Sequence, residues 1–316
     1  MRPMPFLSRA FAAPAFLVRW PALALVLNAM VWGCAWWPFR QLEHLGLHPL
    51  WATVLVYGVA VSVIVAARPR APRQLLRTPE LWWLLLAAGT TNATFNWAIV
   101  IGDVVRVILL FYLMPLWTVL LARLLLHEPL TPGGALRVAV SLAGAATVLW
   151  PEGRSGWAAV PLPRTLPDWL GVAGGFSFAL NNVLLKRASR WPEEGRAVAM
   201  FGGGMVVAGV LATTLAAQGT LAWPAAPAPG WVLGVLALAA MFLVGNLSLQ
   251  FAAPRLRANV TSVVMLTEVL FASGSAVAFG GGTVTPRLLM GGGLIVAAAL
   301  LSVFEPPQAA AAAAAP

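Results

Sequence analysis

Charged residues and cysteine are the scarcest components of this chain of 316 residues. Only 9% of the residues are charged and Cys34 is the single cysteine, whereas 60% of the residues are hydrophobic. One cysteine excludes a disulfide framework within the chain and a metal site built from several cysteines. The mean hydropathy of +0.84 is far above that of a soluble domain of similar length. The composition therefore indicates an integral membrane protein.

The chain also lacks a polar segment large enough to form a signalling domain, which argues against a receptor or scaffold. Instead, ten apolar segments follow one another, each close to the ~20 residues that a helix needs to cross the hydrocarbon core. They do not alternate polar and apolar residues as the strands of a membrane β-barrel do. We predict an all-α integral membrane protein with ten transmembrane helices, at residues 20–39, 50–67, 81–101, 104–126, 133–150, 169–185, 198–217, 231–251, 258–279 and 288–304.

Basic residues lie between the apolar segments in an alternating pattern. The 20 Lys and Arg residues outnumber the 10 Asp and Glu residues, but they are not gathered on one stretch as in a nucleic-acid-binding protein. If the amino terminus is cytoplasmic, the outside loops hold few of them, namely Arg40, Arg106, Arg154, Arg164 and Arg287. The positive-inside rule then predicts a multi-pass protein with both termini in the cytoplasm. Because the basic residues are dispersed along the chain, no nucleic-acid partner is predicted.

A weak internal duplication appears when the sequence is shifted by 154 residues. Both halves then carry an amide pair spaced i, i+4, on one face of a helix, and a Thr-Pro pair before an apolar segment. The matching positions are Thr131-Pro132 with Thr285-Pro286, Asn92 with Asn246, and Asn96 with Gln250. Because each half contains an odd number of segments, the halves must enter the membrane in opposite senses. We predict two inverted five-helix repeats around a central cavity, an arrangement typical of alternating access.

This duplication divides the chain into five predicted parts. Arg9, Pro14 and Arg19 leave no uninterrupted apolar core for a secretory signal before the first segment. The parts are a cytoplasmic leader at 1–19, a first repeat at 20–151, an external linker at 152–167, a second repeat at 168–304, and a cytoplasmic alanine-rich tail at 305–316.

Several short motifs resemble the EamA-like branch of the drug/metabolite transporter superfamily, whose members are ten-helix bacterial carriers made of two five-helix repeats. Trp32-Gly33 resembles the tryptophan-glycine pair of the family's first helix. The stretch 113–131 resembles its proline-containing helix and terminal glycine-glutamate turn, with His127 in place of the glycine. The stretch 266–269 resembles its glutamate-proline step with Val269 replacing proline, and Gly282 stands where a terminal glutamate is expected.

The resemblance implies a secondary transporter of small metabolites in the bacterial inner membrane, an exporter of amino acids or related compounds. No nucleotide-binding motif is present, so ATP is not expected to drive it directly, and no cofactor is expected. The expected partners are a small-molecule substrate, protons as a candidate coupling ion, and the lipid bilayer. Export is the expected direction, with import as the alternative, and we expect a monomer or a weak dimer.

Glu268 is the deepest carboxylate in any predicted transmembrane segment. An ionisable group at mid-bilayer costs several kcal/mol unless it is paired or hydrated. We therefore take Glu268 as a candidate for substrate binding and proton coupling, facing the cavity together with Thr261, Met265 and Ala272. The alternative is a structural role, with the carboxyl hydrogen-bonded to neighbouring helices.

Side-chain amides form a second set of candidates. They have no hydrogen-bonding partner in hydrocarbon, so they are expected to point inward. The candidate substrate-binding amides are Asn92, Asn96, Asn181, Asn246 and Gln250, with Asn182 beside them. An equally weighted alternative is that these amides hold helices together through hydrogen bonds.

Aromatic residues form the third set. Trp32 and Trp36 are spaced i, i+4 in the first segment, and Tyr112 lies beside Pro115 in the fourth. We consider these three aromatic side chains candidates for substrate binding, with ordinary packing as the alternative. Pro115 removes a backbone hydrogen bond from its helix and is a candidate hinge.

The main alternative function is an integral membrane enzyme, such as an acyl or phosphoryl transferase acting at the membrane surface. Such chemistry needs acid-base or metal-binding residues close together. The group most similar to such a cluster is Glu43, His44 and His48 in the first predicted outside loop. Two histidines and one carboxylate lack a fourth partner, so no metal site and no catalytic residue is predicted.

Overall fold

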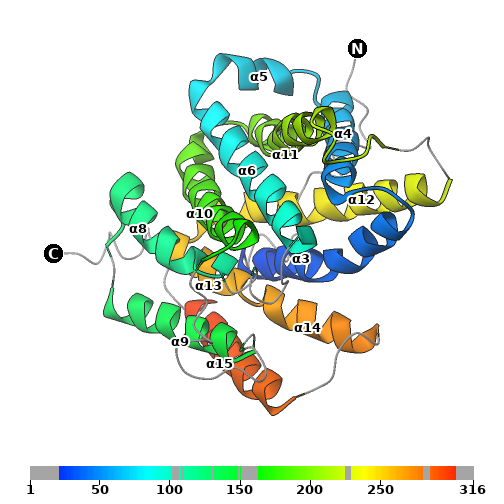
Figure 1. Cartoon of the computed structure of the whole chain (residues 1–316). Coiled ribbons are helices and arrows are strands. Elements are labelled where there is room, and N and C mark those ends of the chain that lie inside the picture. The colour runs from blue at the N-terminus through cyan, green and yellow to red at the C-terminus, as the bar shows by residue number, and fades with distance from the viewer. Residues whose placement is uncertain are drawn as a thin grey trace.

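The computed structural model describes residues 21–101, 107, 110–129, 131–148, 150, 163–224, 229–279 and 285–303. All regular secondary structure in this part of the chain is helical, which confirms the predicted all-α fold (Figure 1). The predicted leader, the predicted tail and residues 152–162 of the predicted linker lie outside the described residues.

Every predicted apolar segment overlaps a helix. In the first half these are α3 (Pro21–His44), α4 (Pro49–Ala67), α6 (Pro79–Ile101), α8 (Met114–Leu126) and α9 (Pro132–Val148). In the second half they are α10 (Leu166–Arg187), α11 (Glu193–Ala217), α12 (Pro229–Ala252), α13 (Ala258–Met265) with α14 (Glu268–Ala278), and α15 (Pro286–Val303). Three short elements were not predicted, namely α5 (Ala71–Arg77) and the 3₁₀ turns η2 (Ala188–Arg190) and η3 (Ala253–Arg255).

Proline marks the start of many of these helices. Pro49, Pro79, Pro132, Pro229 and Pro286 are the first residues of α4, α6, α9, α12 and α15. Proline suits the first helical position because the amide that it lacks has no partner there. Thr131 caps α9, because its Oγ1 accepts a hydrogen bond from the Gly134 amide at 3.1 Å.

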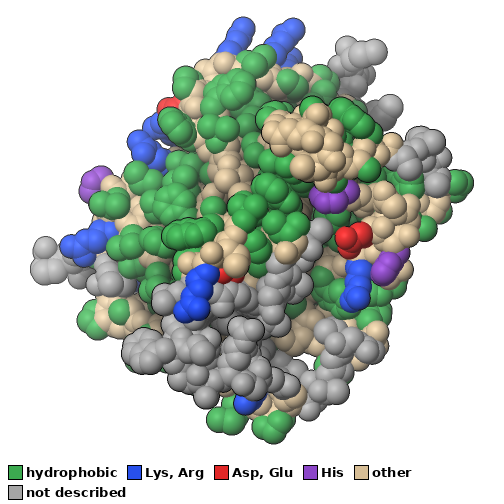
Figure 2. Space-filling view, in the orientation of Figure 1, with side chains coloured by type: hydrophobic (Ala, Val, Ile, Leu, Met, Phe, Trp, Pro, Cys, Tyr) green, Lys and Arg blue, Asp and Glu red, His purple; other side chains and the backbone are tan. Residues whose placement is uncertain are grey.

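Among the described residues, four helical stretches are long and apolar enough to cross a membrane: Pro21–His44, Pro49–Ala67, Glu193–Ala217 and Pro229–Arg255. Large apolar side chains also cover the outside of the bundle, as shown by Leu124, which is 70% exposed, and Leu233, which is 68% exposed. Figure 2 shows hydrophobic side chains over much of one face. A surface of this kind is stable in lipid and would aggregate in water. The chain is therefore a multi-pass membrane protein.

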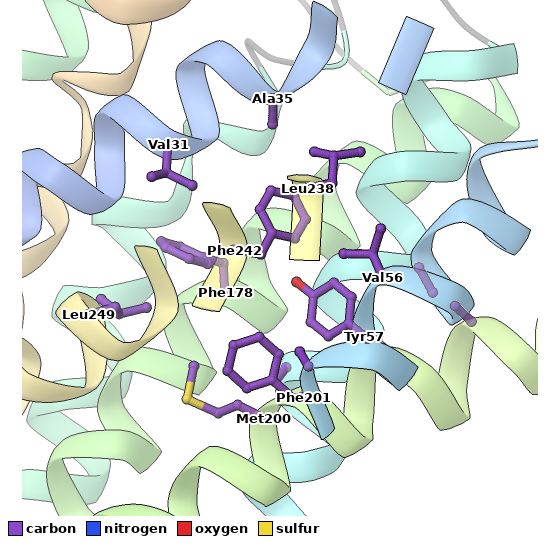
Figure 3. Close-up of a cluster of buried hydrophobic side chains, with 14 of the residues drawn as sticks. Val31, Ala35, Val56, Tyr57, Phe178, Met200, Phe201, Leu238, Phe242 and Leu249 are labelled. Atoms are coloured by element: carbon purple, nitrogen blue, oxygen red, sulfur yellow. The ribbon is translucent and has the colours of Figure 1, made fainter. Parts of the chain in front are cut away.

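The two halves of the chain interlock instead of forming separate bundles. Helix α6 packs against α10 and α11, while α12 packs against α3 and α4, and α9 lies beside α15 (Figure 1). Where α3, α4, α11 and α12 meet, Val31, Tyr57, Phe201 and Phe242 form a buried cluster (Figure 3). The centre of the molecule is thus built from both halves.

Glycine permits the close contact between α6 and α11. A Cβ atom added to Gly203 would lie 2.1 Å from the Leu85 carbonyl oxygen, and one added to Gly89 would lie 2.4 Å from the Gly203 carbonyl oxygen. Both obstacles are backbone atoms, which cannot move without shifting a whole helix. Small residues at such crossings allow two helices to approach closely in a membrane.

We expect Gly203→Ala to lower the free energy of unfolding by about 1–3 kcal/mol, because the added methyl overpacks the α6–α11 contact. The matched control is Gly202→Ala, since a Cβ there meets no heavy atom within 4 Å. Alanine is the better helix former, so the control should be neutral or more stable by up to about 1 kcal/mol. Thermal unfolding of the purified variants measures both effects, and equal midpoints would contradict the packing argument.

Helix α4 begins at an unusual cap. The His48 Nδ1 atom accepts a hydrogen bond from the Leu50 amide at 3.2 Å. Burial lowers the pKa of His48 below its ordinary value of 6.5, although nearby Glu43 opposes the shift. Only an unprotonated Nδ1 can accept this hydrogen bond. The cap therefore contributes stability above the unfolded-state pKa and loses it as the pH falls below that value.

We accordingly expect the wild-type protein to lose about 1 kcal/mol of stability from this cap as the pH falls from 7.5 to about 5. His48→Asn keeps a capping acceptor that does not titrate in this range. Its thermal midpoint should be less sensitive to pH than that of the wild type. Parallel pH curves for the two proteins would show that the cap does not titrate.

The end of α8 joins three helices. His127 adopts a left-handed conformation with φ of 56°, as the turn requires. The family that this stretch resembles has glycine at this position, the residue that adopts such a conformation most easily. Glu128, next in the chain, forms an ion pair with Lys186 at the end of α10. Its second oxygen, Oε2, accepts a hydrogen bond from the Ala258 amide at the start of α13, at 3.3 Å. One carboxylate thus ties α8 to α10 and α13.

Candidate functional site

Two of the predicted amides meet at one hydroxyl in the middle of the bundle. The Tyr57 hydroxyl on α4 donates a hydrogen bond of 2.7 Å to Asn92 Oδ1 on α6, and the side chain of Asn246 on α12 also interacts with this hydroxyl. Each amide anchors itself by donating to the carbonyl four residues earlier, at 2.7 Å to Ala88 for Asn92 and 3.1 Å to Phe242 for Asn246. The structure thus brings together the two positions that the duplication relates.

The second pair of duplicated positions differs between the halves. Asn96 Nδ2 donates a hydrogen bond of 2.7 Å to Thr53 Oγ1 on α4. Gln250, its counterpart on α12, is 2% exposed, yet neither atom of its amide has a hydrogen-bond partner among the described residues. Burying an amide without partners costs roughly 1–3 kcal/mol, so such a group calls for an explanation.

Helix α10 contributes two further buried amides. Asn181 and Asn182 are each 2% exposed, as predicted from their position in an apolar segment. Asn181 Oδ1 and both amide atoms of Asn182 lack a hydrogen-bond partner in the described part of the chain. Like the Gln250 amide, these atoms are buried donors and acceptors that a polar ligand could satisfy.

The predicted fourth and ninth transmembrane helices are both interrupted, at positions related by the same shift of 154 residues. Helix α8 begins at Met114 after a turn at Tyr112 and Leu113, and α14 begins at Glu268 after a turn at Leu266 and Thr267. The hydrogen bonds match as well: the amides of Leu116 and Trp117 both donate to Leu113, and those of Leu270 and Phe271 both donate to Thr267. Short 3₁₀-like interruptions within helices often mark functional hinges.

Glu268 therefore lies at the start of a half-helix, not in the middle of a continuous helix as the sequence suggested. Its side chain is partly buried, and its carboxylate lies near Tyr112 at the other interruption. A Cβ atom on Gly33 of α3 would lie 2.7 Å from the Glu268 carbonyl oxygen, so α3 packs directly on this turn. Of its predicted neighbours, Thr261 and Met265 are buried and Ala272 is partly buried.

The predicted aromatic residues connect the interruption to the amides. Trp36 Nε1 donates a hydrogen bond of 2.9 Å to Ser275 Oγ on α14. The ring of Trp32 lies 4.7 Å from that of Phe242, which in turn lies 5.8 Å from the Tyr57 ring. These contacts link α14, α3, α12 and α4 in one continuous group, part of which is visible in Figure 3.

Pro115 is placed differently from the prediction. It is the second residue of α8, in the first turn, where a missing amide costs nothing. The bend that the sequence assigned to Pro115 lies two to three residues earlier, at Tyr112 and Leu113. The candidate hinge is thus this turn, and Pro115 supports it by starting the half-helix.

Two contributors to this site were missed by sequence reasoning. Tyr57 and Thr53 lie one helical turn apart on α4 and hold Asn92 and Asn96, which are also one turn apart on α6. The available signal was the presence of a tyrosine and a threonine, spaced i, i+4, in a segment whose other residues are apolar apart from Ser62. A polar pair of this spacing indicates a face turned away from lipid.

We expect Tyr57→Phe to destabilise the protein by about 1–3 kcal/mol, because it removes the hydroxyl from two buried amides while keeping the ring. Ring contacts with Phe201, at 5.5 Å between centroids, should persist. Thermal unfolding measures the loss, and Ser62→Ala is the control, since the Ser62 hydroxyl bonds only its own helix at the exposed surface. Equal effects of the two variants would show that Tyr57 acts through its ring alone.

No group of three His, Cys, Asp or Glu side chains that could hold a metal ion occurs among the described residues. His48, part of the group considered in the sequence, caps α4 through Nδ1 instead.

Comparisons with known proteins agree with this architecture. Residues 19–150 match the sequence profile of the EamA-like transporter family. An uncharacterized transporter of Pseudomonas aeruginosa is 29% identical over 143 residues, which cover 43% of this chain and 48% of that protein. The matched region thus spans about half the length of this curated relative. A crystal structure of a protein that is 20% identical has the same fold, with a TM-score of 0.71 over 89% of this chain and 96% of that chain.

The profile match lies in the first half, where Trp32, Asn92, Asn96 and the interruption at Tyr112 are found. The structural match extends the same fold over most of both halves. A family of transporters also disfavours the membrane-enzyme alternative. The first half of this chain, at residues 19–150, thus matches the EamA-like transporter family.

Proposed function

We propose that this protein is a secondary transporter that exports small metabolites, amino acids or related compounds, by alternating access. Two inverted repeats, at 20–151 and 168–304, would together form ten transmembrane helices around a central site. The observation that carries this proposal is the matched interruption of α8 and of α13–α14. Buried amides on α10 and α12 that lack partners among the described residues add to it. In transporters built from inverted repeats, discontinuous helices of this kind line the substrate site near the midplane.

The pattern of helix packing supports the repeats. If the halves are related, α3, α4, α6, α8 and α9 correspond to α10, α11, α12, α13–α14 and α15. If each helix is replaced by its counterpart in the other half, the α6–α10 contact becomes the α12–α3 contact. In the same way, α6–α11 becomes α12–α4, and α8–α10 becomes α14–α3. All six contacts occur in the structure. The contacts α4–α11 and α9–α15 map onto themselves. Such a pattern is expected of two repeats related by a pseudo-twofold axis.

The chemistry of the site supports a small zwitterionic substrate. The half-helices α8 and α14 begin at the interruptions, and helix amino termini attract anionic groups such as a carboxylate. Glu268 would bind an ammonium group or a proton, and Gln250 and Asn182 would supply neutral donors and acceptors. Trp32, Trp36 and Tyr112 would shape the site. Amides bind without carrying charge, which suits a protein that must also release its ligand.

The distribution of arginine supports an orientation with both termini in the cytoplasm of a bacterial inner membrane. The stretch 68–77 holds four arginines, whereas its counterpart at 218–230 holds none. Since Lys and Arg are retained on the cytoplasmic side, the first stretch would lie inside and the second outside.

Uptake into liposomes tests the proposal. The purified protein is reconstituted, and radiolabelled amino acids are screened against quaternary amines, with and without an imposed pH gradient. We expect saturable flux of at least one amino acid that is absent from empty liposomes. Flux that depends on the pH gradient would identify proton coupling. Flux that is the same with and without the gradient would identify facilitated exchange. Chemical conversion of the compounds with no flux would instead support the membrane-enzyme alternative.

A further inference from the structure

A basic depression of about 510 Å³ lies at the surface where α10 ends and α11 begins, away from the central amides. Arg190 comes from η2, Arg196 from the first turn of α11, and Arg255 from η3, with Trp191 and Glu193 between them. The depression joins elements that are about 60 residues apart in the chain. Because it lies at the ends of apolar helices, we place it at the level of the lipid headgroups.

The depression contains buried donors that have no acceptor. Arg196 is 3% exposed, and its Nε and Nη1 atoms have no hydrogen-bond partner among the described residues. Its Nη2 atom lies 3.8 Å from Glu193 Oε1, which is an ion pair but is too long for a hydrogen bond. Trp191 Nε1 is a further buried donor without a partner in the described part of the chain.

The charges in the depression are not balanced. Glu193 Oε1 also lies 4.0 Å from Arg255, so one carboxylate is shared between two guanidinium groups. Arg190 pairs with Glu80 at 3.0 Å, at the exposed rim. Three guanidinium groups thus face two carboxylates. The amino terminus of α11 adds to the positive potential, because Pro192 at its cap offers no side-chain hydrogen bond.

Water could accept hydrogen bonds from these donors, but it could not balance the charge. An anion with several acceptor oxygens would do both, and guanidinium groups bind phosphate oxygens in paired, charge-assisted hydrogen bonds. Basic pockets between transmembrane helices at the headgroup level are known to bind phospholipid headgroups.

We propose that this depression binds a phosphate group, carried by an anionic phospholipid or free in solution. Arg196 donates hydrogen bonds from the buried side of the depression. The other two arginines, Arg190 and Arg255, donate from its exposed rim. This site is separate from the proposed transport site and does not depend on transport activity. Arg196 fixes the position of the phosphate group because it is the most deeply buried of the three arginines.

Binding to the purified full-length protein in a neutral detergent tests the inference. Dioctanoyl phosphatidylglycerol and sodium phosphate are titrated separately, with dioctanoyl phosphatidylcholine and sodium chloride at matched ionic strength as controls. The thermal midpoint reports binding, since a ligand of the folded state raises it. Stabilisation by phosphatidylglycerol alone identifies a lipid headgroup, and stabilisation by phosphate as well identifies a site open to free phosphate.

Variants decide whether the depression is responsible. Arg190→Gln combined with Arg255→Gln changes partly exposed positions and should weaken binding by about tenfold or more, as expected for lost charge-assisted hydrogen bonds. Arg196→Gln should abolish binding, provided that it elutes as a folded protein. Arg187→Gln, an exposed arginine near the same helix end but outside the depression, should bind normally. No stabilisation of the wild type, or equal weakening by Arg187→Gln, would overturn the inference.

Discussion

Replacing Glu268 with glutamine is expected to lower the transport rate by about tenfold or more and to remove any dependence on a pH gradient. Glu268 is the first residue of the half-helix α14 and lies near Tyr112 at the matching interruption. None of the salt bridges among the described residues involves it. A partly buried carboxylate without a basic partner in the described part of the chain is available to a cationic ligand or a proton. Glutamine keeps its size and removes its charge.

The measurement is initial flux into liposomes at several pH values, with the substrate identified by the amino-acid screen. Glu43→Gln is the matched control, because Glu43 undergoes the same chemical change at an exposed position in the last turn of α3. Equal thermal midpoints for Glu268→Gln and the wild type would separate a functional loss from misfolding. Wild-type flux with wild-type pH dependence in Glu268→Gln would remove this residue from the mechanism.

Glu128→Ala is expected to lower the free energy of unfolding by about 3–5 kcal/mol, the largest stability effect predicted for this protein. The Glu128 and Lys186 side chains are only 11% and 12% exposed. Removing the carboxylate leaves the Lys186 ammonium largely buried without its partner and also frees the Ala258 amide. The variant thus loosens α8, α10 and α13 together.

The control is Glu80→Ala, which breaks a salt bridge to Arg190 whose side chains are 44% and 65% exposed. Solvent screens such a pair, so its loss should cost less than about 1 kcal/mol. Thermal or chemical unfolding in detergent compares the two variants. Similar losses of stability would show that burial does not strengthen the Glu128–Lys186 pair.

Residue patterns were sufficient for the helices and for the candidate amides. Runs of apolar residues predicted every helix of membrane-spanning length in the described part of the chain, and Pro132 and Pro286 marked two helix starts. Asn92, Asn96, Asn246 and Gln250 are all buried, as their position in apolar segments predicted. The physical reason is that lipid offers no partner to an amide, so burial follows from local sequence.

These sequence patterns did not predict the interruptions of the fourth and ninth helices. Pro115 suggested a bend in the fourth helix but not its position, and in the ninth helix Val269 stands where a proline would have signalled one. The turn at Leu266 and Thr267 accompanies the packing of α3, where Gly33 contacts the Glu268 carbonyl. A contact between residues more than 200 positions apart leaves no local signal in a single sequence.

By itself, the sequence determined the membrane location and the helical class and indicated the family that its first half resembles, because hydropathy and short motifs act over one helix at a time. Only the tertiary structure decided that Tyr57 bonds Asn92 beside Asn246, that Glu268 begins a half-helix, and that Arg190, Arg196 and Arg255 line one depression. Each of these features requires helices that are distant in the chain to pack side by side, and that packing depends on the shapes of all of them together.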